Sequence, residues 1–400
     1  QILRREKRLP VPAVAPDNGK KIAVVGSGPA GLTCAFYLRK KGYEVTIFEA
    51  LPVAGGMLAA GLPAYRLPRE MLAEEIKVIK EMGVDIRTGK ALGRDFTLED
   101  LREKGCQAVY LAVGAQRSRS LGIKGEDLQG VYPGIGLLRD VNLGVDLDFT
   151  GKNVAVIGGG NVAIDAARSL VRLGTSSVRL YCLESREEMP AHREEVAEAL
   201  QEGVVIYNGW GPREITGVDG KVTGIVLKAC ASVFDSEGRF NPRYNEECVM
   251  ETGVDSVVVA IGQAVDLSFN SSHQKVKTLP GSWLETAADC LTGIPGVFAG
   301  GDCVNGPGSV VEAVKSGKEA AVSIDLYLGG DGQIIDKKTF ARVLSRPVNE
   351  EKLDRQLMPV LASGERKNSF AEVETGFSEE AALAECGRCL RCDVLKVIVI

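Results

Sequence analysis

Short apolar runs followed by glycines recur along the chain, and each leads into a segment of helical periodicity. The first run is Ile22–Val25, the glycine-rich residues 26–31 follow it, and a helix is expected over 29–41. A short apolar run bounded by turn residues is typical of a buried strand in a parallel sheet. The pattern therefore predicts a strand–turn–helix unit, completed by a strand over 44–48 that ends on Glu49.

The same pattern returns further along the chain. A strand over 153–157 leads into glycine-rich residues 158–163, a helix over 161–173 and a strand over 177–183 that ends on Glu184. Two such units in one polypeptide predict an α/β fold with two Rossmann-like nucleotide-binding domains.

Later elements indicate how the two domains are connected. We expect a helix over 69–82, a buried strand over 108–115 that ends in small residues, and a polar β-like stretch over 213–250. A strand over 256–261, a strand over 296–302 that ends on an acid, Asp302, and a helix over 310–328 follow. The last of these return the chain to the first domain, so the second domain is inserted in it. The expected division is an N-terminal arm (1–19), a discontinuous first domain (20–148 and 264–330), a second domain (149–263) and a cysteine-containing tail (331–400).

The glycines of the first unit have separate roles in binding a dinucleotide. Gly26 makes the tight turn, Gly28 lets backbone N–H groups approach a pyrophosphate, and Gly31 lets helix and strand pack closely. Pro29 and Ala30 open the helix, whose N-terminus carries partial positive charge. Glu49 is spaced to accept hydrogen bonds from ribose hydroxyls.

Composition narrows the class of protein. The 400 residues are 45% hydrophobic and 25% charged, with a net charge of −5, so nothing favours a nucleic-acid partner. No apolar run approaches the roughly 18 residues that span a bilayer, and the basic N-terminus lacks the apolar core of a signal peptide. Seven of the ten cysteines are scattered singly, which favours a reducing, cytoplasmic compartment.

The other three cysteines, Cys386, Cys389 and Cys392, have C-x-x-C-x-x-C spacing. This spacing is typical of [4Fe–4S] ligands, although no fourth cysteine is adjacent. The fourth ligand would come from upstream, from a partner subunit or from sequence beyond the chain. The alternative is a tail of unligated thiols.

Several further motifs carry a family resemblance. They are Gly26–Gly31 with Glu49, Ala54–Met57, Gly61–Pro68, Gly158–Ala163, Met189–Pro190, Ala260–Gln263 and Ala299–Asp302. Together they resemble the flavin-containing small subunit of glutamate synthase, the large subunit of NADH-dependent ferredoxin–NADP oxidoreductase and the flavin domain of dihydropyrimidine dehydrogenase.

This resemblance implies FAD in the first domain and a nicotinamide nucleotide in the second. It implies that Asp302 and the start of the last helix hold the flavin's ribityl–phosphate side and its pyrimidine edge. No catalytic acid or base is required, since the flavin carries the chemistry. Besides the residues of the first fingerprint, the expected cofactor-binding residues are Gly55, Gly56, Met57, Arg66, Gly114, Gly158, Gly160, Asn161, Val162, Glu184, Arg186, Gly262, Gly301, Asp302, Ser309 and Val310.

The nicotinamide preference depends on the end of the second domain's second strand. NADP-selective members resemble each other in an arginine pair there, and that pair falls on Leu183 and Glu184 in this chain. A carboxylate accepts from a ribose 2′-hydroxyl and repels a 2′-phosphate, so NADH is favoured. The nearby Arg186 and Arg193 leave NADPH open as the alternative.

The resulting functional hypothesis is an oxidoreductase module that passes electrons from NAD(P)H through FAD to iron–sulfur centres. We expect it to work inside a larger complex, either glutamate synthase-like or electron-bifurcating, with iron–sulfur or flavin-containing partner subunits. The alternative from another class is an FAD-bearing structural or electron-relay subunit with an idle nicotinamide site. A monooxygenase-like flavoprotein, which needs only one fingerprint, is a weaker option.

Overall fold

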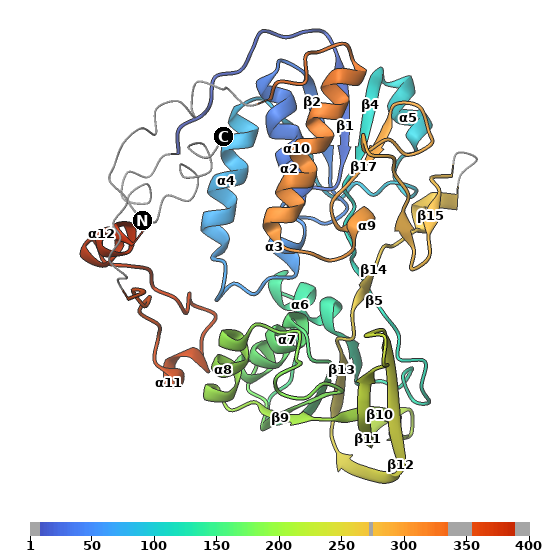
Figure 1. The fold of residues 1–400 in the computed structure, drawn as a ribbon, viewed down its shortest axis with the longest axis vertical. Helices are drawn as coiled ribbons and strands as arrows, with labels where there is room; N and C mark the ends of the chain where they lie inside the picture. Colours follow the sequence, from blue (N-terminus) through green and yellow to red (C-terminus); the bar gives the residue numbers. More distant parts are fainter. Residues whose placement is uncertain (1–8, 272–274, 335–353, 389–400) are drawn as a thin grey trace.

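The structure, a computed structural model, describes residues 9–271, 275–334 and 354–388. Two five-stranded parallel sheets dominate it, and they lie one above the other in Figure 1. The expected α/β class is confirmed. The helix bounds predicted from sequence hold to within one residue: the structure has α2 (Pro29–Lys40), α4 (Arg69–Glu81), α7 (Asn161–Arg172) and α10 (Val310–Tyr327).

The first sheet has the strand order β17-β4-β1-β2-β3. Its strands are β1 (Lys21–Val25), β2 (Glu44–Phe48), β3 (Asp85–Arg87), β4 (Cys106–Leu111) and β17 (Val297–Ala299). Alternate side chains point to opposite faces: one face packs against α2, α4 and α10, and the other against α5 (Leu98–Glu103). β17 pairs in parallel with β4, so the chain returns to this sheet after the second one is complete.

The second sheet repeats this plan with the order β6-β13-β7-β8-β9. Its strands are β6 (Val131–Pro133), β7 (Asn153–Ile157), β8 (Ser177–Cys182), β9 (Val205–Asn208) and β13 (Ser256–Val259). One face is covered by α6 (Gly134–Asn142), α7 and α8 (Arg193–Gln201). The other is covered by an antiparallel sheet of β10 (Trp210–Val218), β11 (Lys221–Phe234) and β12 (Phe240–Gly253), which accounts for the polar β-like stretch.

One boundary differs from the sequence expectation. The segment 131–148, placed in the first domain on sequence, contributes β6 and α6 to the second sheet, where Val257 of β13 pairs with Val131. β6 is short and carries no glycine fingerprint, so nothing in its residues indicates which sheet it joins. We propose to place the boundaries of the inserted unit in the ribbon formed by β5 (Arg117–Ser118) and β14 (Gln263–Ala264). We call the part built on the first sheet the first unit and the inserted part the second unit.

The remaining elements are short. They are α3 (Met57–Ala60), the 3₁₀ turn η1 (Ser268–Ser271), β15 (Thr278–Leu279), β16 (Trp283–Leu284), α9 (Asp302–Asn305), α11 (Ser363–Arg366) and α12 (Glu379–Gly387). Within the described residues, no helix is both long and apolar enough to cross a bilayer.

Candidate nucleotide-binding sites

The turn after β1 is shaped by contact with the neighbouring strand. Gly26 has φ +105°, and a Cβ there would stand 2.2 Å from the carbonyl oxygen of Ala112. Only glycine fits such a conformation and such an approach. Gly31, in the first turn of α2, would place a Cβ 2.0 Å from the oxygen of Gly26, so a side chain there would push the helix away from the turn.

The helix that follows opens onto empty space. Gly28 is the N-cap of α2, Pro29 lies in its first turn, and a Cβ on Gly28 would meet no atom within 4 Å. The first amides of α2 therefore point toward an open position that suits an anionic group.

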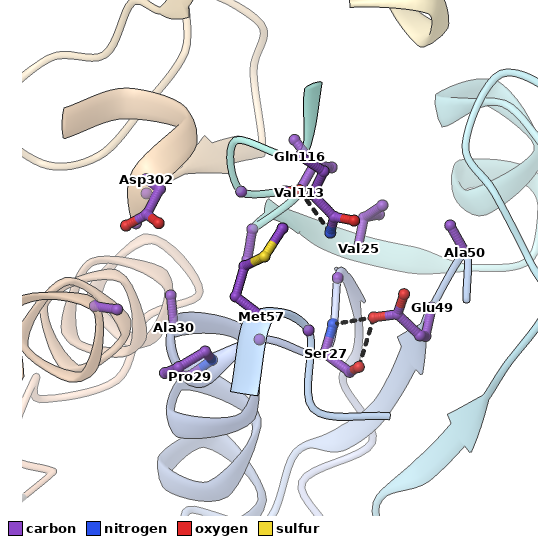
Figure 2. A pocket seen from close by; sticks show the side chains of 18 of the residues that line it. Val25, Ser27, Pro29, Ala30, Glu49, Ala50, Met57, Val113, Gln116 and Asp302 are labelled. Atoms are coloured by element: carbon purple, nitrogen blue, oxygen red, sulfur yellow. Dashed lines mark hydrogen bonds between the residues drawn. The ribbon is translucent and has the colours of Figure 1, made fainter. Parts of the chain in front are cut away.

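Glu49 is held in place at the end of β2. Its side chain is nearly inaccessible, and its Oε2 accepts hydrogen bonds from the backbone N–H (2.9 Å) and Oγ (2.5 Å) of Ser27, drawn in Figure 2. Its Oε1 accepts from the N–H of Leu51 at 2.8 Å. The two hydrogen bonds from Ser27, a residue of the fingerprint, thus hold the carboxylate beside the glycine turn.

A cavity of 250 Å³ runs between these groups and the second half of the first unit. Glu49 and Asp302 lie at opposite ends of it in Figure 2. Twelve residues expected to bind cofactor line it: Gly26, Gly28, Pro29, Ala30, Glu49, Gly56, Met57, Gly114, Gly301, Asp302, Ser309 and Val310.

Sequence reasoning missed two loops that also line this cavity. Lys90–Leu92 and the loop from Asp266 to Phe269 come from distant parts of the chain, and neither contains a fingerprint. A Cβ on Gly93 would stand 2.5 Å from the Cα of Phe269, so the two loops touch. A glycine isolated in a loop was the only sequence signal of this contact.

Asp302 is the acid at the far end of the cavity. It begins α9 rather than ending β17, and burial together with Glu312 raises its pKa to about 6, while a hydrogen bond from the N–H of Gly308 opposes the rise. Beside it, Ser309 caps α10 in a capping box with Glu312, leaving the first amides of that long helix at the cavity wall.

The second fingerprint repeats the geometry of the first. Gly158 has φ +136°, and a Cβ there would stand 2.3 Å from the oxygen of Ala260, as Gly26 would against Ala112. Gly160 is the N-cap of α7 and faces open space. Asn161 begins α7, and its Oδ1 accepts a 2.9 Å hydrogen bond from the N–H of His192, which ties the loop after β8 to this turn.

The acid that follows β8 reaches back over this turn. The Oε2 of Glu184 is 2.7 Å from the point where a Cβ on Gly159 would stand. Arg186 and Arg193 line a neighbouring hollow of 290 Å³, together with Met189 and Val196. The two arginines of the NADPH alternative thus line one hollow, whereas Glu184, the acid expected to favour NADH, lies over the glycine turn.

Seven expected residues remain. Gly55 and Gly262 form positive-φ turns, and the N–H of Gly55 donates to Ser27 Oγ at 3.0 Å. Val162 lies in the first turn of α7. Arg66 is absent from the cavity lining and instead ion-pairs with Asp165 and Glu195 of the second unit. Cys386 is exposed in α12, while Cys389 and Cys392 lie outside the described residues.

Family comparison agrees with this duplicated plan. The model of the pyridine nucleotide-disulphide oxidoreductase family matches residues 20–317. The chain belongs to this family. The expected class of enzyme, an oxidoreductase, is thereby confirmed, and membership supports binding of FAD and of a nicotinamide nucleotide.

Curated relatives within the family extend the match. The chain is 43% identical to "NADP(+)-dependent formate dehydrogenase subunit beta" of Moorella thermoacetica, over 94% of this chain and 55% of that protein. It is 37% identical to "NADPH-Fe(3+) oxidoreductase subunit beta" of Geobacter sulfurreducens, over 94% of this chain and 62% of that protein. It therefore spans little more than half the length of these relatives.

The expected resemblance to the glutamate synthase small subunit is confirmed as well. The chain is 34% identical to "Glutamate synthase [NADPH] small chain" of Azospirillum brasilense, over 77% of this chain and 67% of that protein. Among solved structures, FprA of Mycobacterium tuberculosis in complex with NADPH matches with a TM-score of 0.67 at 22% identity, over 83% of this chain and 88% of that one. Lactococcus lactis thioredoxin reductase matches with a TM-score of 0.59 at 23% identity, over 77% and 99%. These two share the fold.

Proposed function

We propose that this chain is a flavin-dependent NAD(P)H oxidoreductase module, with FAD in the cavity of the first unit and a nicotinamide nucleotide on the fingerprint of the second. One observation carries the proposal. Both units have the same glycine turn against the same kind of strand end, and in both an acid at the end of the second strand reaches that turn. Two sites of one kind, built side by side, suit the exchange of electrons between two dinucleotides.

The residues of the first cavity fit FAD. The open position in front of α2 suits the pyrophosphate, and Glu49 suits the adenosine ribose. At the far end, Asp302 suits the ribityl hydroxyls, and the amides at the start of α10 suit the electron-rich pyrimidine edge of the ring. When bound, FAD supplies hydride acceptance and one-electron release, which no side chain here provides. The residues of this chain bind FAD, orient it and determine the charge that surrounds it.

For the nicotinamide nucleotide we propose a preference for NADH. Glu184 lies over the second glycine turn, where a carboxylate suits a free 2′-hydroxyl and repels a 2′-phosphate. The curated relatives bear names with NADPH or NADP(+), and Arg186 and Arg193 offer this chain a route to the same preference. The ratio of flavin reduction rates with the two nucleotides decides between them.

We further propose that the module works inside a multi-subunit complex and passes electrons to an iron–sulfur or flavin-containing partner. Two of the relatives are named as beta subunits and another as a small chain. Cys386, Cys389 and Cys392 would contribute to a [4Fe–4S] site, the alternative being unligated thiols. The cysteines of the described residues are free, which supports a reducing, cytoplasmic location. Iron and sulfide analysis of anaerobic protein, with and without serine at the three positions, tests the cluster.

Anaerobic mixing with NADH tests the central proposal. We expect the visible absorbance band of the oxidised flavin to disappear after NADH is added to the purified protein. If neither NADH nor NADPH bleaches it, the alternative of a flavin-bearing structural or relay subunit with an idle nicotinamide site is favoured. If the purified protein is colourless and takes up no FAD on reconstitution, both the oxidoreductase proposal and the structural-subunit alternative fail.

A further inference from the structure

The C-terminal segment 359–375 folds onto the junction of the two units, and we call this segment the strap. It is a closed loop: Leu361 N–H donates to the oxygen of Val373, and Thr375 N–H donates to that of Pro359, both at 2.9 Å. Figure 1 shows its helix α11 next to α8 of the second unit. The strap therefore has a defined shape of its own where it meets the rest of the molecule.

The strap contacts the first unit at Tyr65. The N–H of Val373 donates to the backbone oxygen of Tyr65 at 2.9 Å, and the ring of Phe370 lies 6.3 Å from the Tyr65 ring, centroid to centroid. Tyr65 is completely buried, although it lies in a loop between α3 and α4. A loop tyrosine is buried here because the strap and the second unit cover it from different sides.

The strap contacts the second unit through two arginines. Arg366, in α11, is 4% exposed and donates from Nη2 to Gln201 at the end of α8 at 2.8 Å. Arg172, at the end of α7, donates from Nε to the backbone oxygen of Ser369 at 3.1 Å. Both bonds are made at C-terminal ends of helices. The helix α7 begins at the second glycine fingerprint, and α8 begins after the loop that contacts that fingerprint.

The same arginine completes the contact between the units. The guanidinium carbon of Arg172 lies 3.9 Å from the centre of the Tyr65 ring, and that of Arg168 lies 4.9 Å from it. Such cation–π contacts are strongest when water is excluded. Tyr65 of the first unit is thus held between arginines of the second unit and the backbone of the strap.

A second junction lies one residue further along. Arg66 donates to Asp165 of α7 at 2.8 Å and ion-pairs with Glu195 of α8. The units also meet where Asn142 donates to the backbone oxygens of Ala60 and Leu62, and where Met57 packs against the core of the second unit. The chain crosses between them in the ribbon β5–β14, which has two residue pairs. A ribbon this narrow leaves the orientation of the units to be set by the buried contacts beside it.

We propose that the strap is a positioning element that fixes the second unit's orientation on the first, and so sets the approach of the nicotinamide to the flavin. This inference rests on the proposed function, because it assigns the strap a role in the same reaction. Hydride transfer depends steeply on the placement of its two partners, and a displacement of about 1 Å costs about 10²-fold in rate. Loosening the strap therefore lowers the rate of flavin reduction while leaving both nucleotide sites able to bind.

The test uses two variants of the 400-residue chain that loosen the strap at different ends. Phe370→Ala weakens its contact with Tyr65. Arg366→Met removes its bond to Gln201 and its 3.9 Å ion pair with Glu202, and keeps an unbranched side chain in the same place. Leu383→Ala is the matched control, because Leu383 is 67% exposed in α12, outside the strap. Phe370→Leu replaces Phe370→Ala if the latter fails to fold.

Two readouts separate this inference from the proposed function. Hydrogen–deuterium exchange at 61–66 and in α8 is expected to rise in both strap variants and to stay unchanged in the control. The rate of flavin reduction at saturating NADH is expected to fall by at least about tenfold, with half-saturating NADH and FAD content within about twofold of the wild type.

Unchanged exchange, an unchanged rate, or a rise in half-saturating NADH alone would each overturn the positioning role. If wild-type flavin is not reduced by either nucleotide, the proposed function fails, and the exchange data still decide whether the strap holds the two units together.

Discussion

Glu184 lies over Gly159, with its Oε2 2.7 Å from the point where a Cβ on that glycine would stand. In the first fingerprint the matching position is Ser27, which donates twice to Glu49. The two acids therefore occupy equivalent places, but the second one leans over a residue without a side chain. That leaves the carboxylate of Glu184 beside the open N-terminus of α7, where the ribose of a bound nucleotide would lie.

Replacing this acid is expected to change the nucleotide preference. Glu184→Arg removes the repulsion of a 2′-phosphate and offers it a partner, so the ratio of flavin reduction rates with NADPH and NADH rises about tenfold or more, equivalent to about 1.4 kcal/mol. Stopped-flow reduction of the bound flavin measures it. Glu237→Arg, the same charge change at an exposed residue of the β11–β12 hairpin, is the control. An unchanged ratio would assign the preference to Arg186 and Arg193 instead.

The first glycine turn provides a contrast between folding and binding. Gly26→Ala places a Cβ against the oxygen of Ala112 at a positive φ, so we expect a loss of stability of at least about 3 kcal/mol and little bound FAD. Gly28→Ala adds its Cβ in open space at an ordinary φ of −67°. It is expected to fold like FAD-free wild type in thermal unfolding and to bind FAD more weakly. Equal stability of the two variants would contradict the assigned role of the turn.

FAD binding is expected to weaken in acid because of Asp302. In the ligand-free protein burial raises the pKa of this carboxyl to about 6, and hydroxyl donors of the ribityl chain would favour its ionised form. Affinity is therefore full above that pKa and falls as the pH drops through it. Titration of the apoprotein with FAD at several pH values measures the step. Asp302→Asn is expected to abolish the step, and a step that persists in this variant would assign it to another group.

The arginines that surround Tyr65 depend on one buried acid. Burial alone would raise the pKa of Glu202, but hydrogen bonds from Arg172 and Arg168 outweigh it and lower the pKa. Glu202→Gln removes the counter-charge of the buried Arg172 and one of the two that face Arg168, so we expect a loss of about 3–5 kcal/mol in urea unfolding. Glu198→Gln is the comparison, because its carboxylate is 23% exposed and pairs with Arg168 alone among the ion pairs of the described residues. It should cost about 1 kcal/mol or less, and equal losses would refute this account.

Much of the framework was predictable because glycine turns and parallel strands leave local signatures. The helices that follow the two fingerprints, and the acids at the ends of β2 and β8, were expected from spacing alone. β6 was assigned to the wrong unit because three residues carry no periodicity that identifies a partner strand. The contacts of Arg66 were not foreseen, since a motif records which residue is present and not what faces it across a junction.

The cavity shows the same limit. Its fingerprint side was predictable, whereas Lys90–Leu92 and the loop that contains Phe269 reach it only because tertiary packing brings distant loops together. The strap was missed for a related reason. Its anchors, Phe370 and Arg366, resemble ordinary tail residues until their partners Tyr65 and Gln201 are known.

The ribbon of β5 and β14 has a consequence for how such a protein can diversify. The polypeptide enters and leaves the inserted unit through one pair of adjacent strands, Arg117–Ser118 and Gln263–Ala264. A genetic exchange with both breakpoints in this ribbon would transfer the second unit whole and leave the first unit uncut. Donor and host would need to match at the contacts that the second unit makes with Tyr65, Arg66 and the strap, so the two units can evolve along separate lines.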